Sequence, residues 1–434
     1  MESYLDWINR VSSDTEIVPL YFVADFRISP IDKIKYEHET PVKLCNYVDV
    51  YKNTYISSDI DFMEGTASEN EIERFTIKDG DIMITKDSES SDDIGIPAIV
   101  KGDFEELTVC GYHLALITPA REKVVPKFLF YCFESKQHRL QIEIESTGVT
   151  RVGIPKDVIS HYKIPLKSLT QQNKIVAYLD QEVAKIDALI EKKTRLVKLL
   201  EEKKKATISQ AVTKGLNPKV KLKPSGIDWL GDIPEHWEVV KLKYLTDGLK
   251  YGANEAAEED NPDFPRYIRI TDIDENGNLK PETFKSIPLE IANDYILEDG
   301  DILFARSGAT VGKTFRYTSN YGKSAYAGYL IRMRPNLKID SKYMYYFTLS
   351  NSYWSQIYID SIQATIQNFS GDKYANMLVT IPSIDEQLKI AEFLDNHLIQ
   401  FTFLRDKINN SIDLLKEKRT AIISAAINGE INLD

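Results

Sequence analysis

The stretch "LLEEKKKATISQAVTKGLNP", from Leu199 to Pro218, is written a second time as "LLKEKRTAIISAAINGEINL", from Leu414 to Leu433. Both copies place a double leucine, a charged turn, a run of small helix-forming residues and a glycine in the same order. Glycine is common immediately after a helix, because it adopts left-handed backbone angles without strain. The two copies therefore predict two helices that end in the same way, about half the chain apart.

Repetition extends through the whole chain, since further matching segments stand in the same order at offsets between 215 and 222 residues. They are "QNKIVAYLD" (Gln172–Asp180) and "QLKIAEFLD" (Gln387–Asp395), "QIEIES" (Gln141–Ser146) and "QIYIDS" (Gln356–Ser361), "KDGDIMI" (Lys78–Ile84) and "EDGDILF" (Glu298–Phe304), "EIVPL" (Glu16–Leu20) and "EVVKL" (Glu238–Leu242), Ile164-Pro165 and Ile381-Pro382, and Gly111-Tyr112 and Gly328-Tyr329. Ordered matches at a near-constant offset predict a tandem duplication.

Each half is predicted to be a mixed domain followed by a long helix, which makes the fold class α+β. Short apolar or alternating runs, such as "YVDVY" (Tyr47–Tyr51), "DIMIT" (Asp81–Thr85), "YIRIT" (Tyr267–Thr271) and "DILFA" (Asp301–Ala305), are expected to be strands. The predicted boundaries are a first mixed α/β domain over 1–165, a long helix over 166–215, a linker over 216–236, a second mixed α/β domain over 237–383 and a second long helix over 384–434.

The two long helices are predicted to pair as a coiled coil. Residues 170–214 contain neither proline nor glycine, a length of about 67 Å as a straight helix. A mostly apolar seam at alternating steps of three and four runs from Ile175 to Ala211 and from Ile390 to Ala426. We expect an antiparallel pair that spaces the two mixed domains; the alternative is that each helix packs on its own domain. Apolar side chains off the seam make the hydrophobic face wider than two paired helices need, which suggests further helices from a partner. These side chains include Val176, Leu189, Leu196 and Leu199.

The composition limits the class of protein. The net charge is −12, and residues 1–165 hold 18 basic and 29 acidic side chains, net −11. Acidity argues against nucleic acid as a partner, although a basic face can exist on an acidic domain. The chain has no apolar run long enough for a membrane span and no signal-peptide pattern at "MESYLDWINR". Three sparse cysteines fit a reducing cytoplasm, so we expect a cytoplasmic location.

No catalytic pattern stands out in the sequence. The segment "SGATVGKT" (Ser307–Thr314) resembles a phosphate-binding loop, but serine replaces the first glycine and no helical pattern follows. The segment "NPDF" (Asn261–Phe264) falls one residue short of an amino-methyltransferase motif. The histidines and cysteines show no metal-ligand spacing. We expect neither a catalytic nor a metal site, and an ATPase that uses Lys313 is a rival hypothesis.

A duplicated domain on a spacer of two paired helices is an arrangement suited to binding DNA. Two similar domains related by a pseudo-twofold axis can dock on successive major grooves, at half-sites about 34–36 Å apart. Because the two domains differ in most residues, their half-sites should differ, and the target should be bipartite and asymmetric. The alternative is a scaffold of the same two-domain, coiled-coil architecture that binds proteins and not DNA.

The chain resembles the specificity subunit of a type I restriction–modification system. The segments that carry the resemblance are "IPEHWEVVKL" (Ile233–Leu242), "EDGDILFARSGATVGKT" (Glu298–Thr314), "IPSIDEQLKIAEFLD" (Ile381–Asp395) and the two helix endings. The resemblance implies two target-recognition domains that bind double-stranded DNA, and central helices that dock two methyltransferase subunits. S-adenosylmethionine and the catalysis are then expected on those subunits, with motor–nuclease subunits outside them, and this chain binds no cofactor of its own.

Candidate base-contacting residues are expected on loops that follow the repeated strands and on the segment before the closing Ile-Pro. Arg, Lys, Asn and Gln side chains can bond base edges, whereas Ser and Thr can serve bases or phosphates. In the first half they are Lys86, Ser88, Ser90, Thr147, Thr150 and Arg151; in the second they are Arg306, Ser307, Thr310, Lys313, Gln363, Gln367 and Asn368. Tyr112 and Tyr329 are expected to be core residues.

Overall fold

The computed structural model describes residues 15–90, 93–146, 148, 151–257, 260–274, 277–361 and 368–433. The chain divides into two compact units. The first combines residues 1–194 with 409–434, and the second spans residues 195–408. Both divisions fall inside the long helices, so each unit holds a mixed domain and one segment of each helix. None of the described helices is long and apolar enough to cross a membrane.

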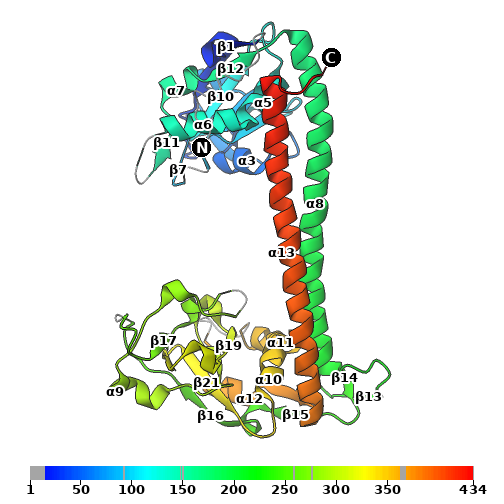
Figure 1. Cartoon of the computed structure of the whole chain (residues 1–434). Helices are drawn as coiled ribbons and strands as arrows, with labels where there is room; N and C mark the ends of the chain where they lie inside the picture. The colour runs from blue at the N-terminus through cyan, green and yellow to red at the C-terminus, as the bar shows by residue number, and fades with distance from the viewer. Residues whose placement is uncertain are drawn as a thin grey trace. The chain divides into compact units, whose positions relative to one another are not determined.

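The two predicted long helices are present and are unbroken (Figure 1). Helix α8 spans Leu169–Lys214 and α13 spans Ile384–Asn428. Each is followed by the predicted glycine in the left-handed region, with φ of 73° at Gly215 and 80° at Gly429. The predicted seam positions of both helices are buried or half-buried along their whole length. The spacing of three and four therefore identified the covered face of each helix.

The helix segments are antiparallel in each unit. In the first unit, Asp187 of α8 pairs with Arg419 of α13 at 2.9 Å, and the earlier α8 residues 175–183 share a core with the later α13 residues 423–427. In the second unit, Glu201 lies 3.9 Å from Arg405, and the later α8 residues 208–212 share a core with the earlier α13 residues 390–394. Residue numbers thus increase along α8 in the direction in which they decrease along α13. The alternative that each helix packs only on its own domain is therefore wrong.

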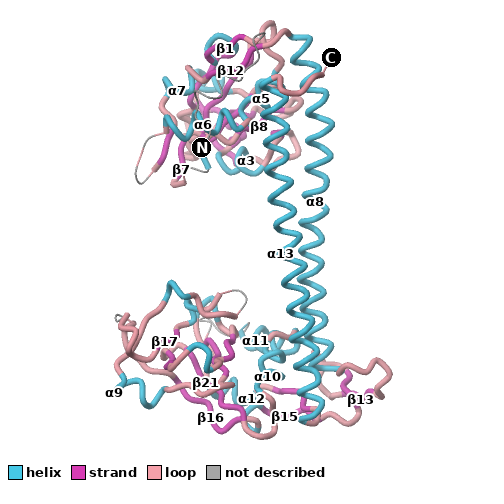
Figure 2. Tube along the Cα trace, in the orientation of Figure 1, coloured by secondary structure: helices cyan, strands magenta, loops and turns pink. Residues whose placement is uncertain are grey.

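The first mixed domain is built on two sheets. One has five strands in the order β2 (Ala24–Ile28), β10 (Leu114–Pro119), β6 (Ile82–Thr85), β8 (Pro97–Val100) and β4 (Tyr55–Ile56). The other has the order β5 (Met63–Ala67), β3 (Thr40–Cys45) and β9 (Thr108–Cys110). Helices α5 (Pro126–Glu134), α6 (Lys136–Glu145) and α7 (Lys156–Ser160) follow, and β1 (Glu16–Pro19) pairs with β12 (Lys163–Leu166). Figure 2 shows strands and helices mixed throughout this unit.

The predicted strand at Tyr47–Tyr51 is wrong, because these residues lie in helix α3 (Tyr47–Lys52). Asp49 N donates to Asn46 O at 3.1 Å, and the Asp49 side chain accepts from the Asn46 amide at 2.8 Å. This reciprocal capping satisfies amides that a helix start leaves free, and it outweighs the alternating pattern of the five residues.

The second mixed domain repeats the plan with a smaller sheet. Its main sheet has the order β16 (Thr246–Tyr251), β21 (Leu330–Pro335), β18 (Ile302–Ala305) and β19 (Thr314–Arg316). Helices α10 (Ser341–Thr348), α11 (Asn351–Ser361) and α12 (Gly371–Asn376) follow, and β15 (Glu238–Lys241) pairs with β22 (Leu378–Ile381). The predicted strand at Tyr267–Thr271 is shorter than expected: β17 covers Arg266–Ile268, and residues 270–272 form a 3-10 turn.

The duplication extends to side-chain contacts. Gln141 of α6 accepts a hydrogen bond from Lys163 N at 2.8 Å and donates one to Lys163 O at 3.3 Å. Gln356 of α11 makes the same two bonds to Leu378, at 2.8 and 3.0 Å. The partners lie 215 residues apart, so Lys163 corresponds to Leu378. This places the Ile164-Pro165 match two residues out of structural register, although the closing strands themselves correspond.

Candidate nucleic-acid interface

The end of strand β6 places Lys86 at the surface of the first domain. Lys86 N donates to His113 O at 2.9 Å, and Lys86 O accepts from Ile154 N at 3.0 Å. The chain continues as β7 (Asp87–Ser88), which pairs with β11 (Val152–Gly153). These backbone bonds hold the predicted residues Lys86, Ser88 and Arg151 in one neighbourhood.

Asp87 organises the charges of this neighbourhood. Its carboxylate lies 2.7 Å from Arg151 Nη2, 2.6 Å from His113 Nδ1 and 3.5 Å from Lys86 Nζ. The Asp87 side chain is only 16% exposed, whereas that of Arg151 is 54% exposed. Burial lowers the pKa of His113, and Arg151 adds to this while Asp87 opposes it. With His113 neutral, the cluster keeps one net positive charge, carried by its outer side chains.

The end of strand β18 places Arg306 in the same way in the second domain. Arg306 N donates to Tyr329 O at 3.0 Å, and Arg306 O accepts from Phe369 N at 2.7 Å. The guanidinium lies over the ring of Tyr251, 4.9 Å from its centroid. In the described part of the chain, the buried Nε of Arg306 has no hydrogen-bond partner.

The loop after Arg306 returns to the sheet. Ser307 bridges to Asn368 across an antiparallel pair, and Thr310 Oγ1 donates to Ser307 O at 3.3 Å. Lys313 O accepts from Ala305 N at 2.8 Å, and the Lys313 residue is exposed. Strand β19 begins at Thr314, so Lys313 does not enter a helix as a phosphate-binding loop requires. The predicted Arg306, Ser307 and Asn368 are neighbours, whereas Thr310 and Lys313 lie farther along the same loop.

Several predicted residues lie elsewhere. Ser90 follows β7, and its amide approaches Ser88 Oγ at 3.5 Å. Thr147, Thr150, Gln363 and Gln367 lie outside the described residues.

Sequence reasoning missed residues that complete both neighbourhoods. Tyr112 and Tyr329, expected in the core, are 49% and 68% exposed, so that expectation is wrong. Tyr112 packs on His113 with ring centroids 3.9 Å apart, and His113 adopts a left-handed φ of 68°. The signal was the repeated Gly-Tyr pair, which marks equivalent turns beside Lys86 and Arg306. Asp87 lay between two predicted residues without being identified.

A second surface lies on the helix segments of the second unit. A cavity of about 460 Å³ opens between the end of α8 and the beginning of α13, lined in part by Leu200, Phe393 and Leu404. Leu196 and Leu199 are 49% and 50% exposed, as an additional partner would require. In the first unit Leu189 is 47% exposed, but Val176 packs against the domain core instead.

The chain holds two unlike mixed domains, and each presents a basic side chain at the end of an equivalent strand. Each domain is also joined to both long helices. These features define a duplicated recognition protein. The type I restriction modification DNA specificity domain model matches residues 25–199 and 234–414. The chain therefore belongs to the type I restriction–modification specificity family, whose members are the specificity subunits of these systems.

Known relatives agree with this assignment. The MjaVIII specificity subunit of Methanocaldococcus jannaschii is 26% identical over 320 residues, which cover 70% of each chain. The StySPI specificity subunit of Salmonella potsdam is 26% identical over 208 residues, covering 46% of this chain and 44% of the relative. A solved structure from a study of complex assembly and conformational transition of the type I R-M system has a TM-score of 0.71, with 17% identity, and covers 97% of this chain and 99% of that one. That likeness supports the fold.

Proposed function

We propose that this specificity subunit recognises a bipartite, asymmetric target in double-stranded DNA, with one half-site for each mixed domain. The observation that carries the proposal is the equivalence of Lys86 and Arg306. Both follow the equivalent strand and are fixed by the same two backbone bonds. Their surroundings differ, because Lys86 adjoins an acidic residue and Arg306 lies over an aromatic ring. Different side chains at equivalent backbone positions favour two different half-site sequences.

The continuous helices suit a constant gap between the half-sites. A helix advances about 1.5 Å per residue, and the absence of internal breaks in α8 and α13 supports a gap of constant length. The bases in the gap then need no contact with this chain. Sequencing of methylated adenines in DNA modified by the assembled complex should return one split motif with a gap of constant length.

Arg306 provides the sharpest test of base recognition. Arg306→Ala, in complex with the methyltransferase subunits, should weaken binding about 5- to 150-fold, since a bidentate Arg–guanine contact discriminates by about 1–3 kcal/mol. The loss should appear for targets that carry the correct second half-site and vanish when that half-site is scrambled. Lys86→Ala is the matched variant and should affect the other half-site. An equal loss on every DNA sequence would make Arg306 a phosphate contact.

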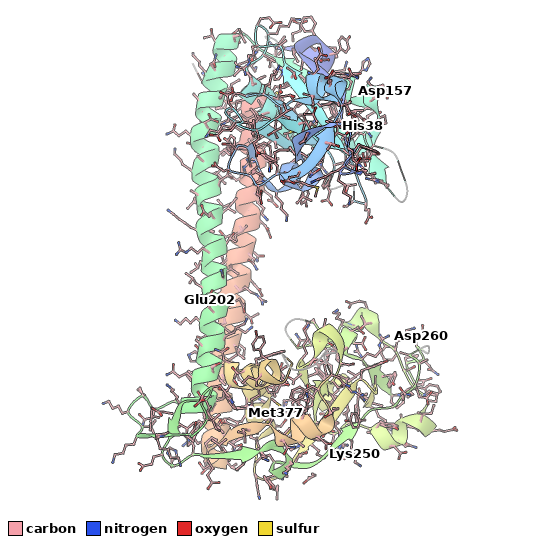
Figure 3. The ribbon with its side chains drawn as sticks, turned by 180° about the vertical axis from the view of Figure 1, so that it is seen from behind. His38, Asp157, Glu202, Lys250, Asp260 and Met377 are labelled. Atoms are coloured by element: carbon pink, nitrogen blue, oxygen red, sulfur yellow. The ribbon has the colours of Figure 1, made fainter. Side chains whose placement is uncertain are left out.

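The helices are proposed to dock two methyltransferase subunits, outside which the motor–nuclease subunits bind. The exposed leucines and the cavity on the second unit supply apolar area for partner helices. Leu196→Glu with Leu199→Glu should abolish co-purification of a methyltransferase subunit. Glu202→Gln, at the exposed position labelled in Figure 3, is the control and should leave co-purification unchanged. Retention of the partner by the double variant would contradict this docking site.

Catalysis and S-adenosylmethionine are proposed to belong to the methyltransferase subunits, with this chain non-catalytic and free of cofactor. The relatives are named as specificity subunits, which supports this division. Methyl transfer should require both components. Transfer by the isolated chain would refute the division.

The net charge of −12 favours one competing function, a protein-binding scaffold without DNA contacts. A gel shift of the complex at two salt concentrations separates the two functions. Sequence-selective retention at the higher salt supports DNA recognition, because non-specific phosphate binding falls steeply with salt.

A further inference from the structure

The first domain has a surface cavity that no side chain among the described residues fills. It has a volume of about 360 Å³ and is lined by α6 (Gln141, Ile144), by α7 (Asp157, Val158) and by the turn into β12 (His161, Tyr162). Ile144 is 60% exposed, so its apolar side chain is accessible to an occupant of the cavity. The site lies at the pairing of β12 with β1, near the first described residues of the chain.

The second domain has the corresponding cavity, and there a tryptophan lines it. The lining residues, each 215 positions later, include Gln356 and Ile359 of α11, Asp372 and Lys373 of α12, and Asn376 and Met377. Trp229 of the linker is an additional lining residue and packs against the second core. Figure 3 labels Asp157 in the first set and Met377 in the second.

Trp229 is carried by a compact turn of the linker. Ser225 Oγ accepts from Ile227 N at 3.2 Å. Leu230 N and Gly231 N both donate to Ile227 O at 3.0 Å. Leu230 is 8% exposed, and Gly231 leaves the turn with φ of 65°. The sequence of this turn, "SGIDWLG", thus presents Trp229 on one side and buries Leu230 on the other.

The same pattern occurs near the start of the sequence, before strand β1. "SYLDWIN" (Ser3–Asn9) matches "SGIDWLG" (Ser225–Gly231) at an offset of 222. That is also the offset between β1 and β15, the strands that follow them. Asn9 stands where Gly231 has a left-handed φ, and asparagine tolerates that region better than other side-chain-bearing residues. Tyr4 stands where Gly226 has φ of 77°, which a tyrosine rarely adopts, so the correspondence is confined to Leu5–Asn9.

We propose that Leu5–Asn9, which lies outside the described residues, docks on the first domain with Trp7 in the cavity beside Ile144. Eight positions separate Trp7 from Thr15, the same number that separates Trp229 from Trp237. Eight residues reach up to about 26 Å when extended, and Lys163 of β12 lines both the cavity and the edge paired with β1. The occupant of the cavity is thus a segment of the same chain, and the first domain is completed by residues before its first strand. This docking is independent of DNA recognition.

Tryptophan fluorescence of the full chain tests the proposal. The emission of Trp7 is obtained by subtracting the spectrum of Trp7→Phe from that of the unmodified chain. Its quenching by acrylamide should be several-fold weaker than that of a free indole. Ile144→Asp changes an already exposed side chain, so the domain should fold, and it should raise the quenching of Trp7 to the free value. Ile359→Asp, the matched change in the second domain, should leave Trp7 protected.

Three outcomes would overturn the proposal. The first is full accessibility of Trp7 in the unmodified chain, and the second is protection that Ile144→Asp does not remove. The third is protection that disappears on dilution over two orders of magnitude, because an occupant from a second copy obeys mass action and an intramolecular one does not. Circular dichroism of each variant confirms that the fold is retained.

Discussion

Replacement of Arg419 should destabilise the first unit strongly. Arg419 on α13 lies 2.9 Å from Glu134 Oε2 at the end of α5, and its Nε donates to Asp187 Oδ1 on α8 at 2.9 Å. The side chains of Arg419 and Glu134 are only 18% and 15% exposed. Burial raises the pKa of Glu134, which Arg419 opposes. Arg419 is thus the main group that favours the ionised carboxylate of Glu134, and Lys127 makes a smaller contribution in the same direction.

The magnitude follows from what Arg419→Leu leaves behind. Removing one partner of a buried ion pair costs about 3–5 kcal/mol, because the other charge remains desolvated. The contact with Asp187 adds about 0.5 kcal/mol or less, since that side chain is 49% exposed. We expect the free energy of unfolding of the first unit to fall by about 3 kcal/mol at pH 8. Lys416→Leu, at a side chain that is 65% exposed, is the control and should cost under about 0.5 kcal/mol.

The pH dependence has a definite sign. A carboxyl whose pKa is higher in the folded than in the unfolded protein favours folding when it is protonated. Removal of Arg419 raises the pKa of Glu134 further, so the cost of Arg419→Leu should shrink as pH falls from 8 toward the ordinary glutamate range near about 4.3.

The second domain suggests a second substitution that should restore the stability lost in Arg419→Leu. Leu349 of the second domain stands 215 positions after Glu134, so the equivalent site accepts an apolar side chain. Glu134→Leu with Arg419→Leu should recover most of the lost stability, measured by urea unfolding at pH 8 and 5.5. If the double variant is as unstable as Arg419→Leu alone, the stranded charge is not the cause and the reasoning fails.

Two further changes test the backbone and the core of the first domain. At Gly95, φ is 68° and an added Cβ would lie 1.9 Å from Ile142 Cδ1, whereas Gly102 has φ of 82° and open space. Gly95→Ala should therefore lower the thermal stability by about 3 kcal/mol and Gly102→Ala by about 1 kcal/mol, and equal losses would exclude the clash as the cause. Burial lowers the pKa of His138 to about 3, so its protonation favours the unfolded chain. Between pH 6.5 and 5 this should remove about 2 kcal/mol of stability, a slope that His138→Leu should abolish in urea titrations.

The features that the sequence predicts well depend on local rules. The left-handed glycines at 215 and 429 and the seams of α8 and α13 follow from helix geometry and capping, which a few neighbouring residues determine. Helix α3 shows the limit, since the bonds between Asn46 and Asp49 override a five-residue alternation.

The candidate site was harder to predict from the sequence, because its side-chain contacts depend on the tertiary structure. Lys86 and Arg306 could be located from the repeated strands. The pairing of Asp87 with Arg151 joins residues 64 positions apart through β7 and β11, and no spacing in the sequence encodes it. The exposure of Tyr329 depends on how its turn leaves the sheet, which residue type alone does not indicate.

The way Lys86 and Arg306 are held explains how one duplicated frame can accommodate two unlike sets of side chains. The bonds from Ile154 N to Lys86 O and from Phe369 N to Arg306 O are backbone to backbone, as are those from the two basic residues to His113 O and Tyr329 O. Backbone bonds are indifferent to the side chain they carry, so substitution at these positions leaves the strand ends in place. The side chains are then free to acquire different neighbours: a carboxylate and a second cation in one domain, an aromatic ring in the other. Under the proposed function, an exchange of Lys86 and Arg306 alone should therefore not exchange the preferred half-sites, because the neighbours Asp87, Arg151 and Tyr251 stay in place.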